Sequence, residues 1–288
     1  MPTSEPDLKR DAMPDVTGSD EQPVWREDAL DQHLVSLLDP TSFEADQYRT
    51  LRMVVERMHA SKKLIAVTSA VAGDGKTTTT LNLSGALAHA PEARILVADL
   101  DLRTPSMGNR LGLTAQSPGL VDLILDPDLA LDDVVRRLPR FRLSVLPAGR
   151  ALAVTYELLQ APRLATILQE ARRQYDYILL DTPPLVPVPD ARVVADYVDG
   201  FVVVVAAHRT PRPLLGDALN LLDPAKVIGI VFNGDDRPLS GYYGYYYGYY
   251  GRRGRPGRRG DRRRISIVDR VQGLLTRRAV RSGPLPKP

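Results

Sequence analysis

The stretch "SAVAGDGKTTTT", residues 69–80, decides the fold, because it joins a short apolar run to a segment with helical spacing. A turn of backbone N–H groups at a helix N-terminus attracts phosphate through its unpaired amides and the helix dipole. The pattern G-x-x-x-x-G-K-[S/T] is incomplete here, since Ala70 stands at its first glycine. A glycine-rich turn with a chance lysine is the competing interpretation.

The order strand, loop, helix favours a phosphate-binding P-loop over a chance turn. In that loop Lys76 reaches the β- and γ-phosphates of a nucleotide, and the hydroxyl of Thr77 binds Mg²⁺. ATP and Mg²⁺ are therefore the expected cofactors. The residues predicted to bind the nucleotide here are Gly73, Asp74, Gly75, Lys76, Thr77 and Thr78.

Two later apolar runs end in carboxylates, in "VADLDLRTP" and "ILLDTPP". Asp99 and Asp101 lie two residues apart at a strand end, so both side chains lean the same way. Asp181 ends another strand, a position from which a carboxylate reaches the Mg²⁺ of a bound nucleotide. Each aspartate alone is better explained as a helix cap or turn residue. Together with a P-loop, they predict a ligand site at the carboxyl ends of parallel strands.

Short apolar runs rich in Val and Ile alternate with helical stretches along the middle of the chain. This pattern predicts an α/β fold, a mostly parallel sheet with helices on both faces, over about residues 43–236. The helical spacing at 43–59 predicts a helix before the first strand. The expected strands lie at 64–70, 94–101, 143–149, 177–184, 201–207 and 227–234.

Charge and composition set the ends of the chain apart. Residues 1–40 hold ten Asp/Glu against three Lys/Arg, and residues 252–288 hold thirteen Lys/Arg against two Asp. We expect residues 1–42 to be a disordered acidic arm. The absence of cysteine excludes disulfides and thiolate metal sites, and the four histidines lack metal-ligand spacing. No membrane span or secretory signal is found, which predicts a cytoplasmic protein.

Residues 241–251 read "GYYGYYYGYYG" and hold seven of the twelve tyrosines. Such a segment has no aliphatic residue with which to build a core, and its glycines favour flexibility. A low-complexity segment that binds nucleic acid or self-associates is one interpretation. The tyrosines are Tyr242, Tyr243, Tyr245, Tyr246, Tyr247, Tyr249 and Tyr250.

Together, "AGDGKTTTTLNLS", "VADLDLRTPSMGNRLGL", "YDYILLDTPPLVPVPDA" and the tyrosine cluster resemble the cytoplasmic kinase domain of the bacterial tyrosine kinases of capsule and exopolysaccharide export. That family sits within the MinD/ParA-like P-loop ATPases, and the resemblance covers about residues 43–250. It implies a Walker A motif with Lys76 and Thr77. It implies a Walker A′ motif with Asp99, Asp101 and Arg103, and a Walker B motif with Asp181.

The resemblance also implies roles for these residues. In the family the first Walker A′ aspartate, here Asp99, helps to deprotonate the attacking tyrosine, and the second, Asp101, helps to hold Mg²⁺. Lys76, Arg103 and Asp181 complete the expected catalytic set. Asn233 falls where related ATPases contact adenine. The tyrosine-rich tail, residues 237–251, is then expected to be the kinase's own substrate. A phenol is a poor nucleophile, so its attack needs a base and a γ-phosphate held by Mg²⁺.

The segment "DQYRTLR" resembles the family's E-x-x-R-x-x-R element, which joins subunits into a ring. Spacing of three places Asp46, Arg49 and Arg52 on one helix face, which suits a homo-oligomer interface or an ordinary solvated face. The resemblance further implies a separate membrane activator protein of polysaccharide export and a cognate tyrosine phosphatase. We therefore expect the protein at the inner face of the membrane through a partner.

The basic extension, residues 252–288, departs from the family, in which the tyrosine cluster usually closes the chain. Helical spacing of apolar residues from Ile265 onward predicts an amphipathic helix that contacts an anionic membrane or a partner, with no specific nucleic acid expected. The favoured function is an ATP-dependent protein-tyrosine autokinase that regulates polysaccharide synthesis or export. The alternative is a MinD/ParA-like ATPase switch that positions a partner and has no kinase activity.

Overall fold

The structure is a computed structural model, and it describes residues 29–58, 64–113, 118–235 and 266–267. Within these residues eight strands form one sheet, in the order β3-β4-β2-β5-β1-β6-β7-β8. The six strands from β4 to β7 run parallel, and the two edge strands pair antiparallel with their neighbours. The predicted α/β fold class is confirmed. The strands are β1 (Leu64–Ser69), β2 (Ile95–Asp99), β3 (Arg136–Leu138), β4 (Leu143–Leu146), β5 (Tyr177–Asp181), β6 (Gly200–Ala206), β7 (Val227–Asn233) and β8 (Ser266–Ile267).

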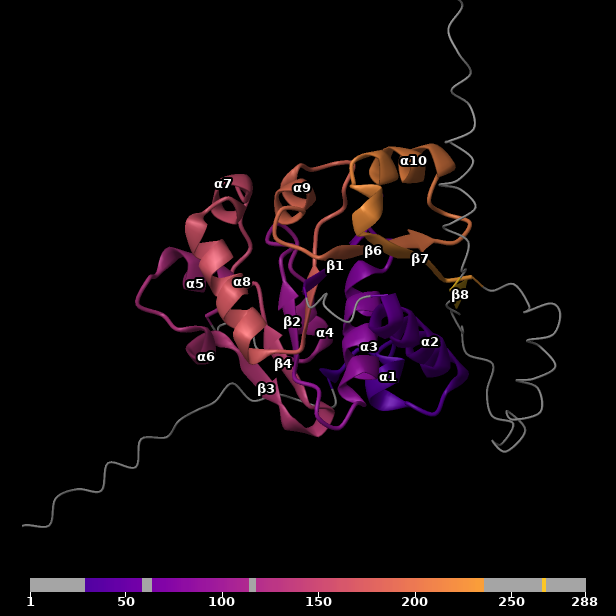
Figure 1. Cartoon of the computed structure of the whole chain (residues 1–288), viewed down its shortest axis with the longest axis horizontal. Helices are drawn as coiled ribbons and strands as arrows, with labels where there is room; N and C mark the ends of the chain where they lie inside the picture. The colour runs from indigo at the N-terminus through magenta and orange to yellow at the C-terminus, as the bar shows by residue number, and fades with distance from the viewer. Residues whose placement is uncertain (1–28, 59–63, 114–117, 236–265, 268–288) are drawn as a thin grey trace, which may run out of the picture.

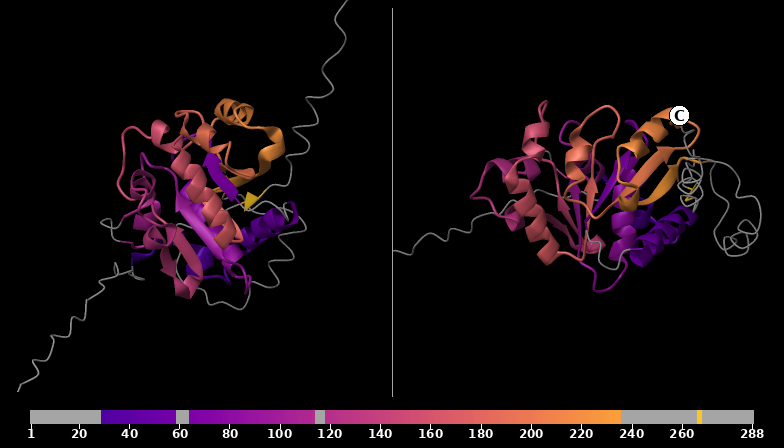
Figure 2. Two further views of the ribbon diagram at one scale, coloured as in Figure 1. Left: turned by 60° about the vertical axis from the view of Figure 1, so that its left-hand side comes forward. Right: turned by 45° about the horizontal axis from the view of Figure 1, so that its top comes forward.

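Helices cover both faces of the sheet, as Figure 1 shows. Helices α1 to α4 lie on one face, and α5 to α10 lie on the other (Figures 1 and 2). The longer helices are α2 (Phe43–Met58), α3 (Lys76–Ala88), α8 (Pro162–Gln174) and α10 (Arg212–Asn220). The shorter ones are α1 (Val35–Leu38), α4 (Met107–Arg110), α5 (Leu120–Leu125), α6 (Leu131–Val134), α7 (Tyr156–Leu159) and α9 (Asp190–Val194).

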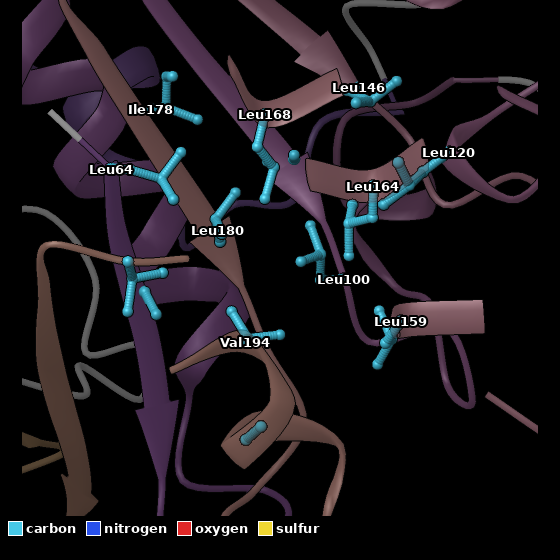
Figure 3. Packing of buried hydrophobic residues seen from close by; sticks show 14 of the residues in the cluster. Leu64, Leu100, Leu120, Leu146, Leu159, Leu164, Leu168, Ile178, Leu180 and Val194 are labelled. Carbon is cyan, nitrogen blue, oxygen red and sulfur yellow. The ribbon is translucent and has the colours of Figure 1, made fainter. Parts of the chain in front are cut away.

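The strands alternate their side chains between two apolar cores. Leu64 and Ala66 of β1 face the core under α5 to α10, and Ile65 and Val67 face the core under α1 to α4. This alternation explains why the strand sequences are apolar at nearly every position, since both faces are covered. Figure 3 shows the first core, where Leu164 and Leu168 of α8 approach the sheet.

The start of the domain differs from the expected boundary at residue 43. Leu30 and Leu34 are buried, and they pack with residues of α2 and α3. Asn82 of α3 accepts a hydrogen bond from the Ser36 amide (2.8 Å) and donates one to the His33 carbonyl (2.8 Å). Residues 29–42 therefore belong to the domain and correct the expected arm of residues 1–42. The acidic composition of residues 1–40 favoured an arm, whereas the helical spacing of Leu30, Leu34, Leu37 and Leu38 is the local signal for this packed segment.

Several sequence expectations concern the ends of the chain. Residues 1–28 and the tyrosine cluster lie outside the described residues, as does most of the basic extension. Ser266 and Ile267 lie in β8, so these two residues are not in the helix expected from Ile265 onward. Within the part of the chain that the structure describes, no helix has the length and hydropathy needed to cross a membrane.

Candidate active site

The P-loop connects β1 to α3, and α3 begins at Lys76 as expected. Gly73 and Gly75 adopt positive φ angles of +82° and +96°, a conformation that favours glycine. Ala70, at the position of the missing first glycine, is fully buried and is not among the residues with positive φ. An alanine is therefore tolerated there, and the incomplete motif still forms the loop.

The end of β7 and the turn after β6 hold this loop in place. The Asn233 side-chain amide donates a hydrogen bond to the Asp74 carbonyl (2.9 Å), and the Thr210 hydroxyl donates one to the Asp74 carboxylate (2.7 Å). A Cβ atom on Gly75 would lie 1.9 Å from Nδ2 of Asn233, so a side chain here would displace the amide that holds the loop. Asn233 thus contacts the P-loop, and its predicted contact with adenine stays a prediction.

The predicted carboxylates meet at the ends of adjacent strands. Asp99 and Asp181 are register partners in the pairing of β2 with β5, and both side chains are buried. Asp99 accepts hydrogen bonds from the backbone amides of Asp101 (3.2 Å), Ser106 (3.2 Å) and Met107 (3.1 Å). These bonds fold the loop after β2 around the carboxylate. The sequence spacing therefore brings Asp99 and Asp181 together, as expected.

Three more of the predicted residues lie around this pair. Asp101 is 8% exposed, and its carboxylate accepts hydrogen bonds from the amide (3.2 Å) and hydroxyl (3.0 Å) of Thr104. Lys76 is also 8% exposed. The Thr77 hydroxyl lies 3.1 Å from the Ser106 hydroxyl, so the P-loop helix and the loop after β2 touch at the site.

Burial changes the acidity of both central carboxyls. Desolvation and the nearby Asp181 charge raise the pKa of Asp99 well above its usual value. Desolvation also raises the pKa of Asp181 to about 6, although the Thr77 hydroxyl and the Lys76 ammonium oppose this increase. Oδ2 of Asp181 is buried without a hydrogen-bond partner among the described residues. Such an atom at a strand end is suited to a cation or a donor from a ligand.

Arg103 has a different environment from the one its predicted catalytic role suggests. Its guanidinium binds the Asp190 carboxylate with two nitrogens (2.8 and 3.2 Å) and the Ala153 carbonyl with the third (2.8 Å). Asp190 is 1% exposed and also accepts a hydrogen bond from the buried Thr155 hydroxyl. Sequence reasoning missed Asp190 and Thr155, because they lie 35 residues apart, at the starts of α9 and α7, and no local pattern links them to Arg103.

The residues predicted to form an oligomer interface lie together on α2 but also bond within the chain. Arg49 pairs with Asp46 and with the Pro40 carbonyl. Arg52 pairs with Glu56 (2.7 Å) and donates to the Ala86 carbonyl near the end of α3 (3.0 Å). The structure therefore places all three residues in α2 with partners inside the chain, and both the shared face and the interface stay predictions.

Comparison with known proteins places this site in a family. A model of the AAA domain matches residues 62–208, just over half of the chain. The tyrosine-protein kinase YwqD of Bacillus subtilis is 28% identical over 71% of this chain and 87% of its own length. The tyrosine-protein kinase CpsD of Streptococcus agalactiae is 30% identical over 68% of this chain and 86% of its own length.

Other similar proteins include a transport protein and solved kinase domains. The succinoglycan biosynthesis transport protein ExoP of Rhizobium meliloti is 32% identical over 71% of this chain, which corresponds to 26% of ExoP. The VpsO kinase domain is 30% identical, with a TM-score of 0.57 over 64% of this chain and 94% of that domain. The BceF tyrosine kinase domain is 30% identical, with a TM-score of 0.59 over 68% of this chain and 78% of that domain.

The similarity to this chain goes beyond the P-loop fold. It extends over most of the length of two curated tyrosine-protein kinases, YwqD and CpsD. The kinase interpretation is therefore better supported than the ATPase switch. The P-loop, the buried carboxylate pair and these similarities together show that the chain belongs to the bacterial tyrosine-protein kinases, within the P-loop ATPase fold.

Proposed function

We propose that this kinase transfers the γ-phosphoryl group of ATP to tyrosines of its own C-terminal cluster, Tyr242–Tyr250. The observation that carries the proposal is the pairing of a P-loop with the buried carboxylates Asp99 and Asp181 at one end of the sheet. The cluster follows soon after β7, which supplies Asn233 to the same P-loop. The first substrate tyrosine therefore follows Asn233, one residue of the nucleotide site, after a short stretch of chain.

Each residue has a task in this transfer. Backbone amides of the P-loop and the Lys76 ammonium bind the phosphates. Asp99 accepts the phenol proton as the tyrosine oxygen bonds to the γ-phosphorus, and the bond from that phosphorus to the bridging oxygen breaks to release ADP. The raised pKa of Asp99 makes its carboxylate a stronger base than an ordinary aspartate. Arg103 positions the loop after β2 through its two bonds to Asp190.

The residues present fit a bound Mg²⁺. Thr77, Asp101 and Asp181 would hold it, and Oδ2 of Asp181 has no hydrogen-bond partner among the described residues. Mg²⁺ prefers one or two carboxylates plus substrate phosphates over a cage of protein ligands. When bound, Mg²⁺ neutralises charge on the phosphate oxygens.

We further propose that the kinase acts in the synthesis or export of an extracellular polysaccharide. The name of the relative ExoP includes succinoglycan biosynthesis transport, which supports this role. The family resemblance supports a membrane partner as activator and a tyrosine phosphatase as antagonist. It also supports a ring of subunits joined through Asp46, Arg49 and Arg52, with the kinase held at the inner face of the membrane by its partner.

Intact-mass spectrometry of the purified full chain after incubation with MgATP tests the phosphoryl transfer. We expect mass increases in steps of one phosphate, up to the number of cluster tyrosines, and no increase when these tyrosines are replaced by phenylalanine. A protein that hydrolyses ATP without any mass increase would instead be an ATPase switch. Mixing separates transfer between chains from transfer within one chain. The mixture contains an inactive Lys76→Met chain with the tyrosine cluster and an active chain that ends at Ser240. Phosphate on the Lys76→Met chain then shows transfer between chains.

A further inference from the structure

The strongest feature outside the nucleotide site is a small apolar surface next to Arg103. Ala151, Ala153, Val154 and Tyr156 are all exposed, and we call them the 151–156 patch. Val154 is 68% exposed and Tyr156 is 37% exposed. We propose that this patch docks the tyrosine cluster, residues 241–251, of a second copy of the chain. The inference rests on the proposed function and adds the surface that receives the substrate.

Hydrogen bonds on both sides of Val154 fix its outward position. The Ala153 carbonyl accepts a hydrogen bond from Arg103 (2.8 Å), and the fully buried Thr155 hydroxyl donates one to Asp190. The Leu152 amide donates to the Leu102 carbonyl (2.9 Å), which adds a third attachment. A side chain that is already held in place loses little conformational entropy when a partner covers it. The 151–156 patch is therefore preorganised for binding.

These hydrogen bonds join the patch to the loop after β2, which carries Asp101 and surrounds Asp99. The patch's attachment points, Leu102 and Arg103, directly follow Asp101 in the loop that also wraps Asp99. A chain segment lying on the patch would therefore place its neighbouring residues at the site. The other large apolar side chains exposed within the described residues, which are Leu38, Met53 and Leu125, lie on α1, α2 and α5. Single exposed apolar residues are ordinary on protein surfaces.

The tyrosine cluster has the chemistry that this patch can bind. Residues 241–251 contain seven Tyr and four Gly and no charged residue, and residues 151–156 are also uncharged. Aromatic rings pair favourably with the Tyr156 ring and bury the Val154 methyl groups. Glycines between the tyrosines allow the backbone to approach closely. The exposed Glu157 that follows the patch is opposite in charge to Arg252 and Arg253, which follow the cluster, and Arg150 before the patch pairs with Asp122.

Transfer between two different full chains tests the docking surface. The enzyme is the full chain with its seven cluster tyrosines replaced by serine, and the acceptor is the full Lys76→Met chain. The enzyme carries Val154→Ser, Tyr156→Ser or both, and Leu125→Ser is the matched control because Leu125 is equally apolar and 55% exposed. Initial rates are measured against acceptor concentration, and ATP affinity is measured separately by titration.

We expect each substitution in the patch to raise the KM for the acceptor chain on the order of tenfold, since each removes the burial of one large apolar side chain. The kcat, the ATP affinity and the behaviour of Leu125→Ser should match those of the unsubstituted enzyme. Val154→Ile should retain the low KM. An unchanged KM in the double variant overturns the docking surface, and so does a loss of ATP affinity.

Two further outcomes separate this inference from its alternatives. If the double variant shifts an oligomeric enzyme toward monomer in light scattering, the patch is a subunit interface and the docking proposal is wrong. If the unmodified full chain gains no phosphate in MgATP although it binds ATP, the proposed function itself fails, whereas a chain that binds ATP and labels only itself contradicts docking between copies. Label on the acceptor together with an unchanged KM defeats the docking surface alone.

Discussion

At the scale of single residues, the site concentrates buried charge. Asp99 and Asp181 lie side by side at paired positions of β2 and β5, and both are almost completely buried. Removing a carboxylate from water is costly unless a cation or several donors compensate, so the unliganded site is unstable by itself. Functional sites commonly carry such a cost, which substitutions can remove together with activity. Two predictions follow from the different tasks of these residues.

Substitutions of Lys76 and Asp99 should distinguish ATP binding from phosphoryl transfer. Lys76→Met removes a positive charge from the phosphates, so it should abolish both ATP binding and tyrosine phosphorylation. Asp99→Asn keeps the shape of the side chain but removes the proton acceptor, so phosphorylation should fall at least a hundredfold with ATP affinity largely retained. ATP titration and mass spectrometry measure the two quantities. Full kinase activity in Asp99→Asn would eliminate its role as the base.

The raised pKa of Asp181 predicts a pH-dependent stability. The folded state holds a proton to about pH 6, whereas the unfolded carboxyl releases it near pH 4. The unfolding free energy therefore falls as pH rises through this window. Asp181→Asn should stabilise the protein above pH 6 by on the order of 2 kcal/mol, and less toward pH 4.

Urea unfolding in EDTA without nucleotide, at several pH values, measures this difference. Asp217→Asn, at an exposed position of α10, is the matched control and should leave the curve unchanged. A gain of equal size at every pH would show that the effect of Asp181→Asn does not come from its titration.

At the scale of elements, the N-terminal segment acts on the P-loop helix. The buried Asn82 amide bonds to Ser36 and His33 of this segment and to the Thr78 carbonyl (2.9 Å) within α3. Gly85 provides the space, because a Cβ atom there would lie 2.7 Å from Leu37. Asp31 pairs with Arg110 of α4, so one segment joins the helices that follow the P-loop and the Walker A′ strand.

Asn82→Ala should therefore destabilise the fold by about 2 to 4 kcal/mol, because it leaves the buried Ser36 amide without its acceptor and removes the hydrogen bonds to the His33 and Thr78 carbonyls. Asn109→Ala, at an exposed position of α4, should change stability by less than about 0.5 kcal/mol. Chemical denaturation of the two variants gives the comparison. Equal midpoints would mean that the segment contributes little to the domain.

The two arginines of α2 should separate folding from assembly. Arg52 is part-buried and binds a carbonyl in the last turn of α3, so Arg52→Ala should lower the unfolding free energy by about 1 kcal/mol. Arg49 is more exposed, so Arg49→Ala should retain stability but shift the protein toward monomer in light scattering. An oligomer that withstands Arg49→Ala would return this face of α2 to ordinary solvated surface.

At the scale of the whole molecule, sequence periodicity predicted the sheet, and the polar ends of two strands predicted where Asp99 and Asp181 lie, but no pattern predicted the links between loops. All six strands expected from apolar runs are present, because burial on both faces leaves a strong local signal. The two edge strands are short, and β3 carries two arginines, so no such signal marks them. The bonds of Arg103 to Asp190 and of Asn82 to Ser36 join residues far apart in sequence, which no local pattern encodes.

The charge of the whole chain should change with phosphorylation. Each phosphotyrosine adds about −1.5 to −2 charge at neutral pH, and the thirteen basic residues of the extension follow the cluster directly. Full phosphorylation of the cluster roughly cancels this positive charge. Binding to anionic vesicles should then fall on phosphorylation and disappear on truncation after Gly251, as measured by co-sedimentation. Equal binding by the unmodified, phosphorylated and truncated proteins would contradict this expectation.

The attachment of residues 29–38 to α3 and α4 has a mechanical consequence. A pulling force on the chain from its N-terminal side is first carried by Leu30 and Asp31, which are anchored in the core and to Arg110. The load then passes through the Asn82 bonds to the helix that begins at Lys76. Tension on the N-terminal side of the chain would therefore load the helix that follows the nucleotide loop together with the core behind it.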